Sequence, residues 1–159
     1  MADKQIAEVG VEVLVMLDEE VLLLRRADTE PYSGLYGLPS GSVEGFETPK
    51  QAAGKKVMEY LGLDVEDSKF TSAITVHRRS KTGVNIDFFL ILDNVDEDKV
   101  KNNNPDKCDE LKWFHIHNIP EDDMIPYIKD VISSYKNWNN YLEDHTSYLN
   151  MRTTPLKIV

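Results

Sequence analysis

One short stretch of the sequence places three positions that could hold a metal ion beside one another on a helix. Positions 56, 59 and 60 lie within one helical turn and can converge on a single point. Carboxylates there would supply the hard oxygen ligands that Mg²⁺ takes together with substrate phosphates and water. The chain carries Lys56, Glu59 and Tyr60, so only one position offers a carboxylate. The chemistry of this stretch therefore depends on what Lys56 and Tyr60 do instead.

The residues around these three positions predict a helix over about 49–61. Thr48 is a good N-cap, Pro49 suits the first helical position, and Gln51 completes a capping-box pattern. Gly62 stands where a left-handed C-terminal cap belongs. Apolar residues recur at three- and four-residue spacing, so that one face of the helix can be buried: Ala52, Ala53, Val57, Tyr60 and Leu61.

The stretch from Gly41 to Leu63 resembles the Nudix box, G-x5-E-x7-R-E-U-x-E-E-x-G-U, in which U is a bulky aliphatic residue. The chain aligns with this pattern without a gap and matches it at Gly41, Glu47, Val57, Glu59, Gly62 and Leu63. Lys55 keeps the charge of the arginine, whereas Lys56 and Tyr60 replace two glutamates. The flanking segments VLLLRRADTEPYSGLYGLPSG, VHRRS, IDFF, PDKCDELKWF and IPYI resemble bacterial MutT-type Nudix proteins, so the resemblance covers about residues 8–135.

This resemblance implies both a fold and a reaction. The fold is an α/β/α Nudix sandwich, in which a mixed sheet lies between the box helix and a C-terminal helix at about 122–142. The reaction is Mg²⁺- or Mn²⁺-dependent hydrolysis of a nucleoside diphosphate linked to another group. The resemblance assigns metal binding to Gly41 and Glu59, catalysis to Glu59 and Glu110, and a structural role to Glu47, Lys55 and Gly62.

Lys56 and Tyr60 favour a reduced or altered activity. An ammonium at position 56 repels Mg²⁺ and can pair with Glu59 at i,i+3, although such a pair contributes only about 0.2–0.5 kcal/mol on a solvated helix. The phenol of Tyr60 is a poor Mg²⁺ ligand while it is protonated. The alternative is a catalytically inactive Nudix domain that acts as a nucleotide-binding or protein-interaction module.

Two arrangements could compensate for the missing carboxylates. In the first, a relocated metal site forms around Glu59 from other acids, namely Glu44, Glu47, Asp109 and Glu110. In the second, Lys56 acts as a fixed cation and binds the diphosphate directly, as lysines do in other phosphate sites. The second arrangement predicts nucleotide binding without a metal ion.

Composition limits the partners. The chain has a formal net charge of −10 and a pI near 4.8, which argues against a nucleic-acid backbone or an anionic membrane as partner. The partner that we expect is a small nucleotide or a nucleoside diphosphate derivative. Its anion could bind Arg26 or Arg78, which stand in the two basic clusters, although solvated strand ends are the simpler explanation of these residues. Tyr32 could line a base pocket.

With 159 residues and 41% hydrophobic content, the sequence predicts one domain over 1–145. The segment 146–159 shows no periodicity, and we expect it to be disordered or to pack on a partner in a homodimer. A single cysteine, Cys108, together with the absence of a recognisable signal or membrane-spanning run, favours a cytoplasmic protein with a packed thiol.

The remaining segments are predicted to form a mixed sheet and a helix. Residues 9–17 and 21–26 form a hairpin, and further strands lie at 69–78, 84–92 and 110–116. The run KNNNPDK (101–107) is expected to be a mobile loop. Trp138 belongs to the apolar stripe of the C-terminal helix. His115 and His117 have a spacing that metal sites use, but no third ligand lies nearby in the sequence.

Overall fold

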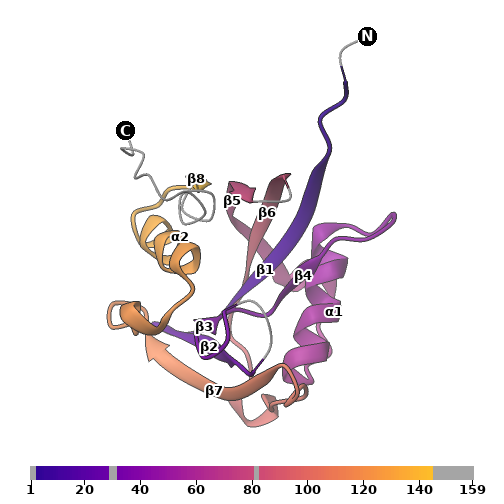
Figure 1. Cartoon of the computed structure of the whole chain (residues 1–159). Helices are drawn as coiled ribbons and strands as arrows, with labels where there is room; N and C mark the ends of the chain where they lie inside the picture. Colours follow the sequence, from indigo (N-terminus) through magenta and orange to yellow (C-terminus); the bar gives the residue numbers. More distant parts are fainter. Residues whose placement is uncertain (1–2, 29–31, 81–82, 145–159) are drawn as a thin grey trace.

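The structure is a computed structural model that describes residues 3–28, 32–80 and 83–144. Strands of one mixed sheet lie between two helices (Figure 1). The strands are β1 (Ala7–Leu17), β2 (Glu20–Arg26), β3 (Tyr36–Gly37), β4 (Ser40–Ser42), β5 (Phe70–Ser80), β6 (Gly83–Leu92), β7 (Cys108–His115) and β8 (Tyr141–Asp144). The helices are α1 (Pro49–Leu61) and α2 (Pro126–Lys136), and short 3₁₀ turns occur at Asp67–Lys69, Glu97–Lys99 and Glu121–Asp123.

Strand β1 is the centre of the sheet. The strand order is β3-β2-β1-β6-β5-β8, with β4 paired to β1 and β7 paired to β2. β1 runs parallel to β6 and antiparallel to β4, whereas its last residues form the predicted hairpin with β2 through Met16↔Val21 and Leu17↔Glu20. Because β4 pairs with β1 at Gly10–Glu12, the start of the box segment lies directly beside the central strand.

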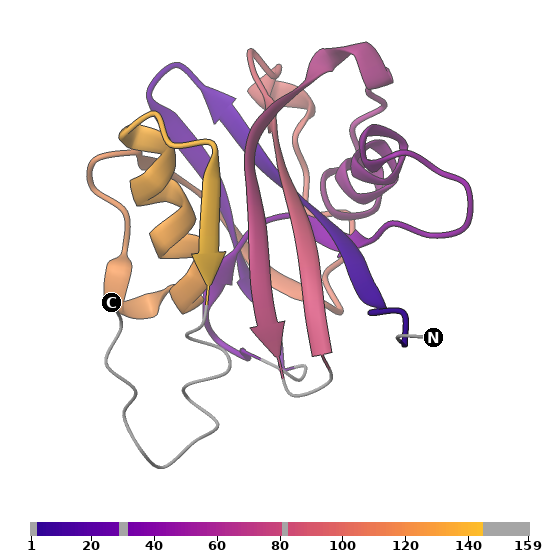
Figure 2. The same ribbon diagram turned by 90° about the horizontal axis from the view of Figure 1, so that it is seen from above.

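The two faces of the sheet are covered by different helices (Figure 2). Val11, Val13 and Val15 of β1 are buried in the cluster that includes the apolar face of α1. Leu14 and Met16 are buried in the second cluster with α2. This alternation follows from the two-residue period of side chains along a strand. The predicted α/β/α sandwich is confirmed.

Local signals at both ends of α1 act as predicted. The Thr48 hydroxyl accepts a hydrogen bond from the Gln51 backbone N–H at 3.2 Å, and the Gln51 side chain accepts one from the Thr48 N–H at 2.9 Å. Gly62 has φ of +69°, and its N–H donates to the Met58 carbonyl at 3.0 Å. The left-handed backbone at this position favours glycine.

The C-terminal helix is shorter than the predicted span of 122–142. It runs from Pro126 to Lys136, because Pro126 starts the helix rather than lying inside it and Glu121–Asp123 is a separate 3₁₀ turn. After the helix ends, Trp138 has φ of +62° and is 94% exposed, so its assignment to the apolar stripe was wrong. The chain then enters β8, which pairs in parallel with β5.

The predicted tail at 146–159 lies outside the described residues. Within the part of the chain that the structure describes, no helix is long and apolar enough to cross a membrane.

The capping box gives a direct test of how α1 is held in place. Thr48→Ala removes the side-chain acceptor, so we expect a loss of about 1 kcal/mol in the free energy of unfolding, measured in urea. Thr48→Ser is the matched control, because serine supplies the same acceptor and should stay within a few tenths of a kcal/mol of the parent. Equal stability of the Ala and Ser variants would contradict the assigned role of the cap.

Candidate functional site

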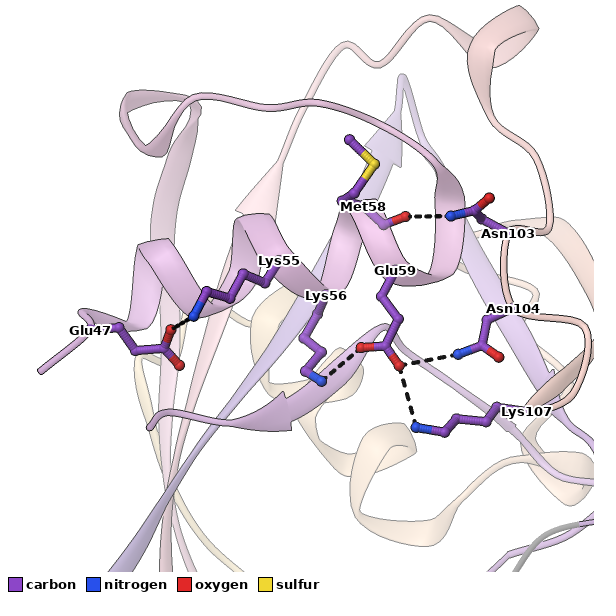
Figure 3. Close-up of polar contacts among 8 residues, drawn as sticks. All are labelled: Glu47, Lys55, Lys56, Met58, Glu59, Asn103, Asn104 and Lys107. Atoms are coloured by element: carbon purple, nitrogen blue, oxygen red, sulfur yellow. Dashed lines mark hydrogen bonds and ion pairs between the residues drawn. The ribbon is translucent and has the colours of Figure 1, made fainter. Parts of the chain in front are cut away.

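Glu59 lies at the centre of a network of N–H donors (Figure 3). Lys56 Nζ is 2.8 Å from Glu59 Oε2, so the predicted i,i+3 pair is present. Asn104 Nδ2 at 3.1 Å and Lys107 Nζ at 3.3 Å both donate to Glu59 Oε1. The Lys56 ammonium, assisted by Lys107, holds the pKa of Glu59 below its ordinary value. Glu59 is therefore an ionised carboxylate with two ammonium groups against it.

Lys56 also lies against the backbone of Gly41. A Cβ on Gly41 would come 2.1 Å from Lys56 Cε and 3.0 Å from Lys56 Nζ. No residue other than glycine fits unless the lysine moves. The ammonium of Lys56 thus lies close to both residues to which the family resemblance assigns metal binding, Gly41 and Glu59.

The segment 101–107 is docked on the C-terminal end of α1, which corrects the prediction of a mobile loop. The Lys101 and Asn103 N–H groups donate to the carbonyls of Leu61 and Tyr60, at 3.1 and 2.9 Å. Asn103 Nδ2 donates to the Met58 carbonyl at 3.0 Å (Figure 3). The Leu61 and Tyr60 carbonyls lie in the last turn of the helix, where the helix supplies no N–H partner, so they accept external donors, and the Met58 carbonyl accepts from Asn103 in addition to Gly62. The docked segment in turn brings Asn104 and Lys107 to Glu59.

The box loop that precedes α1 is tied to the helix by an ion pair. Glu47 Oε2 contacts Lys55 Nζ, and Glu47 Oε1 accepts a hydrogen bond from the Glu44 N–H at 2.8 Å. Lys55 holds the pKa of Glu47 below its ordinary value. The contact expected between Glu47 and Lys55 is present through Oε2, while Oε1 of Glu47 holds the loop through Glu44.

Asp109 and Glu110, two of the acids considered for a relocated metal site, lie on β7, which pairs with β2. Arg25 contacts Asp109 Oδ1 at 2.7 Å and Glu110 Oε2 at 2.9 Å. The Tyr36 hydroxyl also donates to Glu110 Oε2, at 2.8 Å. Among the described residues, no three His, Cys, Asp or Glu side chains come close enough together to hold a metal ion. The relocated metal site is therefore not assembled.

A cavity of about 210 Å³ adjoins the Glu59 network. Arg26, Lys107 and Tyr60 line it with polar groups, and its other walls are Leu24, Gly37, Leu38 and Cys108. Lys107 lines the cavity and also contacts Glu59, so the cavity borders the Glu59 network. The Cys108 thiol donates to the Glu110 carbonyl, and burial raises its pKa, which is the expected packed thiol rather than a nucleophile. The cavity can receive a small anion.

Comparison with known proteins identifies the family. The NUDIX domain model matches residues 7–135. The chain belongs to the Nudix family. It is 26% identical over 132 residues to the ADP-ribose pyrophosphatase of Methanocaldococcus jannaschii, a match that covers 83% of this chain and 75% of that protein.

Two solved structures share the fold. A MutT NUDIX hydrolase from Burkholderia pseudomallei superposes with a TM-score of 0.71 at 21% identity, over 81% of this chain and 98% of that one. The NUDIX domain of Shewanella oneidensis NrtR, complexed with ADP ribose, superposes with a TM-score of 0.68 at 17% identity, over 84% and 89% of the two chains.

Nudix hydrolases generally use a divalent metal such as Mg²⁺, and the residues of this Nudix box do not fit one. Gly41 and Glu59 are the only predicted ligands, and both oxygens of Glu59 already accept from cationic or amide donors. The ammonium of Lys56 lies against Gly41. A divalent cation there would face two ammonium groups and one carboxylate, whereas Mg²⁺ sites use carboxylates, phosphates and water.

Three other candidate residues lie away from this network. Tyr32 is partly buried against the core cluster on the α2 side and has φ of +67°. Arg78 lies on β5, where its Nε donates to Asp87 Oδ2 at 2.8 Å. His115 pairs with Glu19 through Nε2 at 3.4 Å and accepts from the His117 N–H through Nδ1, so both ring nitrogens have partners without a metal.

A second polar group is buried on the α2 side of the sheet, and the sequence analysis did not identify it. Glu12 is 4% exposed and accepts from the Tyr127 hydroxyl at 2.8 Å, while Asp87 is 3% exposed and pairs with Arg78. Burial, with the nearby charge of Asp87, raises the pKa of Glu12 to about 8. A lone acid within each apolar strand, GVEVLVML and NIDFFLIL, was the available signal.

The raised pKa of Glu12 predicts how stability depends on pH. Between about 4.5 and about 8 the folded state binds more protons than the unfolded state, so this group lowers stability as pH rises through that window. Glu12→Gln removes the titration, although Asp87, Arg78, Tyr127 and Arg26 still surround the site.

We therefore expect the stability of Glu12→Gln relative to the parent to increase steadily from pH 5 to pH 8.5, measured by urea unfolding. Glu20→Gln, an exposed change at the start of β2, should show a constant difference. Parallel pH profiles of the parent and Glu12→Gln would contradict the burial argument.

Proposed function

We propose that this Nudix domain binds the diphosphate group of a nucleoside diphosphate derivative through fixed cationic side chains, and that Mg²⁺-dependent hydrolysis of the pyrophosphate bond is weak or absent. The observation that carries the proposal is the position of Lys56. Its ammonium contacts Glu59 at 2.8 Å and packs on Gly41, where the family pattern expects metal ligands.

The local charge supports an anion. Two ammonium groups, Lys56 and Lys107, oppose one carboxylate at Glu59, which leaves one positive charge in excess although the chain as a whole is acidic. Arg26 adds a guanidinium on the wall of the adjoining cavity. Hydrogen bonds between such cations and phosphate oxygens are about twice as strong as neutral ones. These cations would offset the negative charge of the phosphates, as a bound Mg²⁺ ion does in a metal-dependent site.

The names of relatives support a nucleoside diphosphate derivative as the ligand. One relative is named an ADP-ribose pyrophosphatase, and one Nudix domain of the same fold was solved with ADP ribose. ADP-ribose, a nucleoside diphosphate linked to a second sugar, is therefore the first ligand to test. A scaffold role in which the domain binds only proteins predicts that no nucleotide binds.

Hydrolysis with altered metal use remains the second candidate, because the relatives carry hydrolase names. It requires that Lys56 leaves Glu59 when substrate and metal enter together. The two candidates differ in a simple respect, since binding through lysines needs no metal, whereas hydrolysis needs a divalent cation to stabilise the charge that develops.

Removal of the Lys56 ammonium tests the binding site. In EDTA, we expect the parent to bind ADP-ribose in isothermal titration calorimetry, and Lys56→Ala to bind about tenfold or more weakly because a charge-assisted contact is lost. Lys50→Ala is the matched control, since Lys50 is exposed on the same helix. Equal affinity of Lys56→Ala and the parent, or binding that appears only with Mg²⁺, would contradict the proposal.

Restoring the carboxylates tests the loss of hydrolysis. We expect Lys56→Glu with Tyr60→Glu to gain Mg²⁺-dependent release of AMP from ADP-ribose over a nearly silent parent, because three carboxylates then lie within one helical turn. Lys56→Gln with Tyr60→Gln removes the same side chains without adding charge and should stay silent. A parent that already hydrolyses ADP-ribose as fast as the double Glu variant would overturn the proposed inactivity.

A further inference from the structure

A groove of about 760 Å³ lies between the segment that follows α1 and the segment that follows β6. Residues 63–69 form one wall of this groove, and residues 92–99 form the other. Its lining residues, all in the described part of the chain, do not include Lys56, Glu59 or Lys107. The groove is therefore a separate feature from the proposed diphosphate site.

The two walls are alike in sequence and in backbone. Residues 64–69 read DVEDSK, and residues 94–99 read NVDEDK. Each segment ends in a 3₁₀ turn, Asp67–Lys69 in the first and Glu97–Lys99 in the second. In both turns the backbone N–H of the lysine donates to the carbonyl three residues before it, at 3.0 Å. The groove is thus formed by two similar turns that face each other.

The floor of the groove is apolar. Val65 and Val95 hold the same position in the two turns, and Leu63 and Leu92 also line the groove. Leu63, Leu92 and Val95 are 8%, 3% and 9% exposed, and Val65 packs against the same core cluster on the α1 side. The floor can contact apolar side chains of a ligand, but its small exposed area leaves the charges on the rim to decide which ligand binds.

The rim of the groove is acidic. Four exposed carboxylates oppose two exposed ammonium groups, and these are Asp64, Glu66, Asp93 and Asp96 against Lys69 and Lys99. Lys99 Nζ already lies 3.9 Å from Asp96 Oδ2. The negative excess attracts a cationic ligand and repels both phosphate groups and a second copy of this chain, whose net charge is −10.

The shape of the surface favours an extended polypeptide over a small molecule. Asp64 and Val65 also line a second groove, of about 530 Å³, which continues over the outer face of α1. Met58, which is 41% exposed, lies along this continuation. Small molecules bind where they are largely enclosed, whereas an extended peptide can follow a long open surface with alternate side chains in contact.

We propose that the groove between residues 63–69 and 92–99 is a docking site for a cationic segment of a partner protein. Side chains of an extended segment alternate between two faces, so apolar side chains can rest on Val65 and Val95 while lysine or arginine side chains reach the carboxylates of the rim. The docked segment would lie behind the helix that carries Glu59. Its binding does not require the proposed contact of Lys56 with a diphosphate.

The probe is a capped pentapeptide of the sequence Lys-Leu-Lys-Val-Lys. In ¹H–¹⁵N NMR titrations of the full chain, we expect it to shift the amides of residues 63–69 and 92–99 selectively. An increase in salt from about 0.05 M to about 0.5 M should weaken binding, because exposed charges are screened. Lys-Ser-Lys-Ser-Lys keeps the charge without the apolar side chains and should bind more weakly, and Glu-Leu-Glu-Val-Glu should not bind.

Charge reversal on one wall tests the location of the site. Asp64→Lys with Glu66→Lys should weaken binding of the pentapeptide about tenfold or more, because like charges then face each other. Asp122→Lys with Asp123→Lys is the matched control, since it makes the same change of net charge in the exposed turn before α2 and should leave the affinity unchanged.

Three results would overturn the inference. The first is an absence of shifts in the parent, and the second is shifts spread over all acidic segments or weakened equally by both double variants, because binding then follows net charge alone. The third is binding of spermine to the same amides as tightly as the pentapeptide, because a polyamine carries the charge without side chains for the floor. If the Asp64→Lys, Glu66→Lys chain fails to fold, the position of the shifted amides in the parent decides.

Discussion

The contact of Glu59 with Lys56 is the interaction on which the rest of the site depends. An ion pair on an exposed helix contributes little to stability, but this one decides which charge stands beside Gly41. With a carboxylate at position 56 the site would be anionic and would attract a divalent cation. With Lys56, and with Lys107 on the other oxygen of Glu59, the site carries an excess of positive charge, and we propose that it attracts phosphate oxygens directly. The same backbone arrangement therefore presents a positive charge where the family pattern presents a negative one.

The positive charge beside Glu59 does not come from Lys56 alone, because the docked segment 101–107 adds Lys107. Asn103 is bound to the end of α1 through both its backbone and its side chain, which fixes the approach of Asn104 and Lys107 to Glu59. Binding the helix carbonyls and binding Glu59 are therefore coupled. A ligand that displaced Lys107 would also disturb the C-terminal turn of α1.

Local signals in the sequence were sufficient for part of this account. The capping box of Thr48, the glycine cap at Gly62 and the Glu59 pair involve residues close in sequence, and each was predicted correctly. The docking of 101–107 was not, because its partners lie more than forty residues away on α1. The same limit applies to Glu12 and Asp87, which meet only because β1 and β6 pair in parallel. The end of α2 was missed because an apolar pattern continues through Trp138 while the backbone turns there.

The central claim is that ammonium groups replace the metal ion at the box, and paramagnetic broadening by Mn²⁺ measures this directly. In ¹H–¹⁵N NMR spectra of the full chain, added Mn²⁺ should leave the amides of Gly41, Lys56 and Glu59 no more broadened than those of exposed acidic loops. The same titration of the Lys56→Glu, Tyr60→Glu chain should broaden these amides selectively. Selective broadening of Gly41 and Glu59 in the parent at low Mn²⁺ would contradict the account, because it would place a divalent cation where the structure places Lys56.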